Sequence, residues 1–497
     1  MNSILPLFVI IPLGTAFLIS IFGKRIKAIS DVLTILGTMS LLMFSLYTIN
    51  VVHLHKVLVY KVGGWMPPIG ICMVLDGLTS FMLVTVNLVT FLITVYCINY
   101  MEKYTEKYRF YTLFMLMLAG MNGIIVTGDL FNLFVFLEIA SIASYALVAF
   151  GTEAEELEAS FKYAVMGSVA SSFILLGIAL LYSYTSTLNM ADISLVLSQR
   201  GGGFLVSFIT AMFLAGFGLK AALVPFHAWL PDAHPSAPAP ISAMLSGVLI
   251  KVLGVYAIIR IFFNVIGANS IILSILMFLG TISMLIGVVL ALAQWDVKRL
   301  LAYHSISQIG YVILGIGLGS PLGLLGGLFH LFNHSAFKSL LFLNSGAIDY
   351  TVGTRDLHHM GGLRERMAIT ANTNLIASMS IAGIPPFNGF WSKLLIILAC
   401  LQSGYVIYAI CAVIASILTL ASFMKVQRYA FFGNLHKKWQ DIKEVPWAMG
   451  LSMVILALIC IVSGLLLLPL FKPYLESAVD VLLIGKGYAE AVFANIR

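Results

Sequence analysis

The stretch that decides the fold runs from residue 220 to residue 251 and reads KAALVPFHAWLPDAHPSAPAPISAMLSGVLIK. Apolar sequence lies on both sides of it, yet it begins and ends with lysine and carries prolines at 225, 231, 235, 238 and 240. Proline removes a backbone donor and clashes with the preceding turn, so a helix must break here. Because unwound backbone survives at membrane depth only where it lines protein or water, the stretch predicts a broken helix inside a membrane bundle.

A second stretch, IAGIPPFNGFWSK at residues 381–393, has the same pattern. Each stretch carries a Pro-Phe pair followed by a tryptophan, and Lys393 takes a place loosely equivalent to that of Lys220. The breaks fall in the seventh and twelfth predicted helices. The two breaks are therefore five helices apart. Because five is an odd number, the two broken helices cross the membrane in opposite directions, so we predict inverted five-helix repeats. Paired interruptions of this kind point to the working site of a transporter, although kinks in a receptor-like bundle are an alternative.

The composition agrees with a membrane protein. Of 497 residues, 60% are hydrophobic and 10% charged, with a mean hydropathy of +1.02, whereas soluble domains carry about 25% charged residues. We predict an all-α integral membrane protein with about 14 transmembrane helices, since apolar runs of about 18 residues or more recur throughout. The predicted spans are 3–22, 30–50, 72–100, 109–127, 131–150, 160–186, 203–223, 240–263, 271–293, 301–319, 321–347, 368–402 (broken), 404–430 and 447–470.

Four regions follow from these spans. Residues 1–108 hold helices 1–3 with an extra-membrane β-hairpin near 52–69, 109–263 form the first repeat, 271–430 the second, and 447–497 a last helix with an interfacial tail. Most of the 28 lysines and arginines fall in connections after odd-numbered helices. Basic loops stay in the cytoplasm, so both termini are predicted outside a bacterial-type cytoplasmic membrane. The net charge of +7 follows from this topology and does not indicate nucleic acid binding.

Seven ionisable side chains fall inside predicted membrane helices, and together they indicate proton handling. A lone lysine at the centre of such a helix costs roughly 2.5–3.5 kcal/mol on insertion scales, so it marks an ion or proton pathway by default. A buried lysine can alternate between its charged and neutral forms near neutral pH. The seven candidates are Glu138, Lys220, Lys251, His330, His334, Lys338 and Lys393.

Several of these residues have alternative interpretations. Glu138 either faces a lysine as an ionised partner or stays neutral and hydrogen-bonded to a neighbouring helix, and Lys220 could extend to the interface instead. His330, His334 and Lys338 share one helix face at spacings of four, which suits a proton relay. A pair of histidines four residues apart can also bind zinc, but no acidic or thiol ligand is near in sequence.

A weaker set of polar groups lies nearer the predicted helix ends, where protons could be taken up or released: Asp76, Asp129, Asp232, His234, Tyr303 and His304. The chain has no nucleotide loop, HExxH, nucleophile elbow or CxxCH, and so carries no recognisable covalent catalytic chemistry. Its five cysteines lack ligand-like spacing, so we expect neither metal nor cofactor on this chain. It could still be a subunit of an oxidoreductase or translocase complex.

Three segments carry a family resemblance: GDLFNLFVFLEIASIASYALVAF at 128–150, KAALVPFHAWLPDAHPSAPAPISAMLSG at 220–247, and IAGIPPFNGFWSK at 381–393. The chain, over roughly residues 1–470, resembles the antiporter-like subunits of respiratory complex I, Mrp-type Na⁺/H⁺ antiporters and membrane-bound hydrogenases. The resemblance implies fourteen helices, two inverted repeats and a polar axis at mid-membrane. It also implies an ion pair of Glu138 with Lys220, a connecting Lys251, a central relay and a terminal Lys393.

Within that family the short C-terminus and the lysine at 393 resemble the Mrp D type or its hydrogenase relative, and the parent complex stays open. The expected function is proton conduction inside a complex of homologous and small membrane subunits. Lysine and histidine do not coordinate a hard cation, so any Na⁺ pathway should lie mainly on partner chains. A stand-alone secondary transporter for a small organic substrate is the main alternative, and a membrane enzyme with its own redox centre is a third.

Overall fold

The computed structural model describes residues 4–26 and 28–495 and is a bundle of long helices with one small hairpin. The helices are α1 (Leu7–Phe22), α2 (Ile29–His55), α3 (Gly77–Tyr100), α4 (Lys107–Val126), α5 (Leu130–Val148), α6 (Ala154–Thr185), α7 (Met190–Arg200), α8 (Phe204–Lys220), α9 (Leu230–Ser236), α10 (Ala239–Met244), α11 (Ala257–Ile259), α12 (Ser270–Leu292), α13 (Val297–Gly317), α14 (Pro321–Val352), α15 (Ala368–Ala382), α16 (Asn388–Gln402), α17 (Val406–Val426), α18 (Trp447–Val462), α19 (Lys472–Ile484) and α20 (Tyr488–Ala494). The strands are β1 (Leu58–Lys61) and β2 (Cys72–Leu75).

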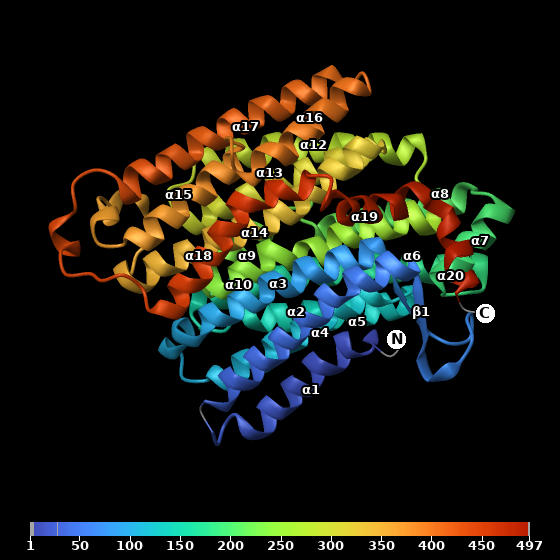
Figure 1. Ribbon diagram of the computed structural model, residues 1–497, viewed down its shortest axis with the longest axis horizontal. Helices are drawn as coiled ribbons and strands as arrows, with labels where there is room; N and C mark the ends of the chain where they lie inside the picture. The colour runs from blue at the N-terminus through green and yellow to red at the C-terminus, as the bar shows by residue number, and fades with distance from the viewer. Residues whose placement is uncertain (1–3, 27, 496–497) are drawn as a thin grey trace.

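The protein is a multi-pass membrane protein. Ten helical segments of the described residues are long and apolar enough to cross a bilayer, and α1, α8 and α16 are shorter apolar helices. Helix α14 is not among the ten because His330, Asn333, His334 and Lys338 lower its hydropathy; these side chains are buried inside the bundle. The beginning of α1 and the end of α20 lie at the same end of the bundle (Figure 1).

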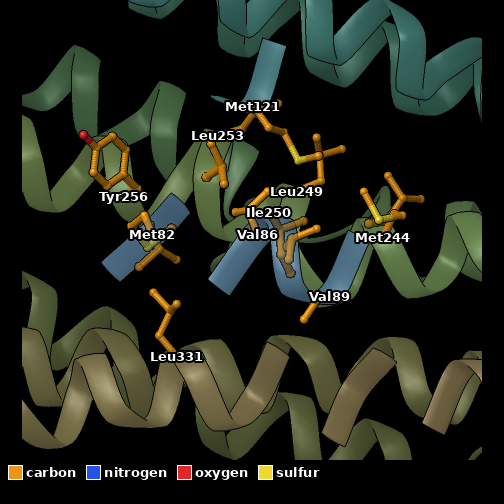
Figure 2. Packing of buried hydrophobic residues seen from close by; sticks show 14 of the residues in the cluster. Met82, Val86, Val89, Met121, Met244, Leu249, Ile250, Leu253, Tyr256 and Leu331 are labelled. Atoms are coloured by element: carbon orange, nitrogen blue, oxygen red, sulfur yellow. The ribbon is translucent and has the colours of Figure 1, made fainter. Parts of the chain in front are cut away.

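The core joins segments that are distant in sequence. Met82, Val86 and Val89 of α3 pack beside Met121 of α4 and Leu331 of α14, and residues 244–256 fill the space between them (Figure 2). Residues 239–266 are buried throughout. This segment is therefore an interior helix, which explains how it can carry a lysine away from lipid.

Both predicted breaks are present. Helix α8 ends at Lys220, and the next helix, α9, begins only at Leu230. Helix α15 ends at Ala382 and α16 begins at Asn388, with Gly383 between them at a positive φ of 82°. Glycine adopts this conformation without steric cost, so the second break is set by Gly383 as well as by the prolines.

Several features differ from the sequence prediction. The predicted hairpin near 52–69 is displaced, because α2 continues to His55 and β1 pairs antiparallel with β2, Leu58 opposite Leu75. The buried strand Cys72–Leu75 was included in the predicted span 72–100 because its four residues are all apolar. Helix α7 was missed, since its sequence is mixed and only the cap, Asn189, marks its start.

The eighth predicted helix is mostly π-helical, over Leu245–Leu249, Lys251–Tyr256 and Arg260–Ile266. Arg260 lies within the predicted span 240–263, and its side chain is buried in the last of these segments. The C-terminal tail forms α19 and α20, and α19 packs against α3 and α14 through Leu475, Ala478 and Leu482.

Candidate functional site

Lys220 lies at the C-terminal end of α8, where the first broken helix stops. Its Nζ donates hydrogen bonds to Ser141 Oγ at 3.0 Å and to Tyr145 OH at 3.3 Å, both on α5. The side chain is 4% exposed. The free carbonyls of a helix C-terminus carry partial negative charge, so this position stabilises an ammonium group without a carboxylate in contact.

Glu138 lies on the same helix as Ser141 and Tyr145. Ser171 Oγ of α6 donates a hydrogen bond to Glu138 Oε1. Glu138 and Lys220 interact electrostatically, but they form no ion pair within 4.0 Å among the described residues. Glu138 and Lys220 are therefore separated, and the lysine bonds to Ser141 instead of to the carboxylate. Small side-chain movements would change the Glu138–Lys220 distance and hence their mutual attraction.

Lys251 is held by its own helix. Its Nζ donates to the carbonyl oxygens of Ser246 at 2.7 Å and Gly247 at 2.5 Å. A π-helix shifts the backbone hydrogen-bond pattern by one residue relative to an α-helix, and here carbonyls of the widened turn accept from the lysine. Close packing joins this segment to α8, since a Cβ added at Gly254 would clash with the backbone of Ala221.

The predicted relay residues of α14 lie fully buried on one face of that helix. His330 Nδ1 lies 2.9 Å from Ser392 Oγ and its Nε2 lies 3.2 Å from Gln308 Oε1. The His334 ring is parallel to the His330 ring, with centroids 6.3 Å apart. Lys338 Nζ donates a hydrogen bond to the Leu301 carbonyl of α13. Hydrogen-bond partners on α13 and α16 therefore surround the stripe.

Lys393 lies in α16, seven residues after Pro386, whereas Lys220 precedes Pro225. The two lysines are on opposite sides of their breaks in sequence. In space, however, Lys393 Nζ reaches back to the Ile381 carbonyl in the last turn of α15, at 2.7 Å, and to Ser416 Oγ at 3.3 Å. Both lysines are thus associated with the C-terminal end of the half-helix before the break, Lys220 as the last residue of α8 and Lys393 through its bond to the Ile381 carbonyl.

All four intramembrane lysines share one environment, in which neutral oxygens accept from the ammonium group and no carboxylate lies in contact among the described residues. Several buried polar atoms around them have no hydrogen-bond partner in the described part of the protein. Such atoms in protein interiors are usually satisfied by water. They belong to His234, His304, Gln308, His334, Asn344, Ser345 and Asn388.

Two of the weaker candidates have structural roles. Asp76 caps α3 by accepting from Thr79 N at 2.8 Å and pairs with Arg260 through two hydrogen bonds of 2.7 and 2.9 Å. Burial would raise the pKa of Asp76, but the Arg260 guanidinium outweighs it together with the Thr79 bonds, so the pKa is lowered. Asp129 caps α5 through Asn132 N, and burial raises the pKa of Asp129.

The remaining weaker candidates divide between surface and interior. Asp232 forms ion pairs with Lys162 and Arg299 near the bundle surface, and Tyr303 is half-buried. His234 and His304 are fully buried, His234 within the short α9 and His304 within α13. His234 stacks on Phe342, one turn from Lys338, and His304 Nε2 lies 2.8 Å from Ser422 Oγ.

Sequence reasoning missed the neutral partners. Ser141 and Tyr145 follow Glu138 by three and seven residues, so helical spacing could have placed them on its face. Gln308 and Ser392 had no such signal, because they come from helices that meet α14 only in the folded chain. Among the described residues, no group of three or more His, Cys, Asp or Glu side chains could hold a metal ion.

The chain is similar to known proteins along most of its length. Residues 127–419 match the family model described as NADH:quinone oxidoreductase/Mrp antiporter membrane region, and residues 65–111 match the complex I chain 5 N-terminus.

The chain is 35% identical to the D-type subunit of the Na⁺/H⁺ antiporter of Alkalihalophilus pseudofirmus, over 99% of both chains. It is 36% identical to the N-type subunit of the NADH-quinone oxidoreductase of Desulforudis audaxviator, over 82% of this chain and 84% of the relative. A chain of the Mrp complex from a Dietzia species superposes with a TM-score of 0.90 at 30% identity, covering 99% of each.

Proposed function

The chain belongs to the NADH:quinone oxidoreductase/Mrp antiporter family, and we propose that it moves protons as the D-type member of a multisubunit cation/proton antiporter. The observation that carries the proposal is the set of buried lysines and histidines whose partners are neutral oxygens. A titratable group held this way can gain or lose a proton without leaving a fixed counter-charge unpaired.

The proposed path begins at Glu138 and Lys220 and continues through Lys251. The contact of Gly254 with Ala221 supports the step between them, since it brings the end of α8 against the lysine's own helix. Lys251 interacts electrostatically with Lys338, and His334 with both of these lysines.

From the centre the path continues through His330 to Lys393. Lys393 interacts electrostatically with both histidines and lies 4.7 Å above the Tyr311 ring. Buried His234 and His304 border the same region, next to Lys338. We assign them as side branches through which protons reach Lys338, and keep Asp232 and Tyr303 as groups for uptake or release nearer the surface. Asp76 and Asp129, both helix caps, are less suited to that role.

The architecture proposed for this activity has fourteen crossings, with 109–263 and 271–430 as inverted repeats. The two breaks support it, because each delivers a lysine ammonium to the end of a half-helix. The common end of the chain termini agrees with an even number of crossings (Figure 1). The excess of basic residues in the connections at the other end supports an orientation with both termini outside the cell.

Partners are proposed from the relatives. The similar solved chain lies in an Mrp complex, and the D-type relative is named as an antiporter subunit. We propose that this chain also assembles with other antiporter-like and small membrane subunits, and that Na⁺, where exchanged, crosses mainly on those partners. The four lysines provide no oxygen ligands for a hard cation. A stand-alone transporter for an organic substrate is less favoured, since the relatives compared above are named as subunits.

The test is antiport in everted membrane vesicles from a host that lacks its own antiporters and expresses the complete set of subunits. Addition of Na⁺ should dissipate a respiration-driven pH gradient with the parent chain and fail to do so with Lys338→Ala. Lys107→Ala is the matched control, because Lys107 also donates to a backbone carbonyl, that of Ile98, but pairs with Asp31 and lies outside the proposed path. Parent-level antiport in Lys338→Ala, with normal assembly, would contradict the proposal.

A further inference from the structure

A groove of about 660 Å³ opens between α2 and α19. Its walls come from α2, α3, the segment 466–471 after α18, and α19, and its floor includes Phe332 of α14. The lining is mostly apolar, with Leu46, Leu88 and Leu470 among its residues. Leu470 is 80% exposed and Leu46 45% exposed, so the groove opens toward lipid.

Charged side chains gather at only one end. His53 and Lys56 lie in the last turn of α2 and just beyond it, and Glu476 and Asp480 lie on the facing side of α19. Glu476 pairs with Lys472 at 2.7 Å. Within the described part of the chain, neither Lys56 nor Asp480 joins an ion pair within 4.0 Å. The end of the groove therefore offers one free cation and one free anion.

The length of the groove matches one leaflet of a membrane. From Leu46 to Lys56 the α2 helix rises about 15 Å at 1.5 Å per residue, which is half of the roughly 30 Å hydrocarbon layer. The charged end coincides with the end of the membrane-spanning helix, where a lipid headgroup lies, and the apolar part extends to mid-membrane at Phe332. A partner helix that crosses the bilayer would need a groove about twice as long.

We propose that this groove binds one zwitterionic aminophospholipid, with its phosphate at Lys56, its ammonium at Asp480 and an acyl chain along Leu46 to Phe332. Charge complementarity selects this class, because a headgroup with one negative and one primary ammonium group matches the two free charges. A choline headgroup has no N–H to donate to Asp480, and a glycerol headgroup has no cation for it. The lipid would also pack against α14, the helix of His330 and His334.

The test uses the complete purified complex in nanodiscs of mixed phosphatidylethanolamine, phosphatidylcholine and phosphatidylglycerol, followed by native mass spectrometry of the lipid retained by this chain. We expect phosphatidylethanolamine to be enriched at least fivefold over its share in the nanodisc. Lys56→Glu and Asp480→Lys should each reduce the enrichment to the bulk share, and the double exchange should restore it.

A second pair of variants tests the apolar part without changing charge. Leu46→Trp narrows the groove and should release the lipid, whereas Leu36→Trp on the same helix, 55% exposed and outside the groove, should not. Retained lipid with the bulk composition in the parent complex would overturn the proposal. So would a cysteine at position 46 that crosslinks efficiently to another subunit, since a protein would then occupy the groove. Antiport in the parent is scored separately, so failure here leaves the proton pathway unaffected.

Discussion

Lys393 Nζ donates a 2.7 Å hydrogen bond to the Ile381 carbonyl oxygen across the break between α15 and α16. The lysine thus neutralises a carbonyl at the helix end that has no α-helical partner of its own. Lys220 achieves a related geometry as the last residue of α8. Two different positions in sequence therefore associate a lysine with the end of the half-helix before each break.

The first prediction concerns the separated pair at the start of the path. Glu138→Ala and Lys220→Ala should each abolish antiport while the complex stays assembled, because each removes a charge that biases the other. Ser141→Ala should have a smaller effect, since Tyr145 still accepts from the lysine. Vesicle antiport and subunit stoichiometry are the measurements. Glu155→Ala, an exposed carboxylate at the start of α6, is the control, and near-normal transport in either alanine variant would refute the assignment.

The second prediction tests His334 as a relay. Glutamine keeps a hydrogen-bonding group but cannot take up a proton, so His334→Gln should slow or uncouple antiport without loss of the folded complex. His55→Gln, at the exposed end of α2, should behave as the parent. Coupling ratios in vesicles decide the matter. Parent-like coupling in His334→Gln, or stoichiometric zinc at His330 and His334, would exclude the relay.

The third prediction is structural and concerns Asp76 and Arg260. Removing one partner of a buried ion pair costs about 3–5 kcal/mol, so Asp76→Asn should lower the thermal midpoint of the purified complex markedly. The folded pKa of Asp76 is lowered from an ordinary 3.8, so this stabilisation is present above that value and is lost as pH falls below it. Melting curves of parent and variant should therefore begin to approach each other below about pH 4 and meet only below the lowered pKa of Asp76. If the difference in thermal midpoint between parent and variant stayed constant at still lower pH, a lowered pKa for Asp76 would be contradicted.

Much of this site could be predicted from sequence because its signals are local. Prolines within apolar runs predict the breaks. Lysines in the middle of apolar helices indicate function because their insertion into a membrane costs free energy. The four-residue spacing of His330, His334 and Lys338 places them on one face. The Ser392 and Gln308 contacts could not be predicted, since they depend on how α13 and α16 pack against α14. The pairing of Asp76 with Arg260 could not be predicted for a related reason, since only the fold brings the two side chains together.

The last prediction asks whether Lys393 works by titration or only by charge. Arginine keeps a positive charge but is not deprotonated in proteins, and a cavity of about 250 Å³ beside Lys393 leaves room for the larger side chain. Lys393→Arg should therefore assemble normally yet lose proton-coupled transport by at least tenfold. Lys107→Arg is the matched control, because Lys107 donates to the Ile98 carbonyl and pairs with Asp31 outside the path and should retain parent activity. Antiport in vesicles gives the rate, and passive proton leak after the gradient collapses reports any loss of sealing. Full activity in Lys393→Arg would mean that the site needs only a fixed positive charge, and the path would then have to end at His330.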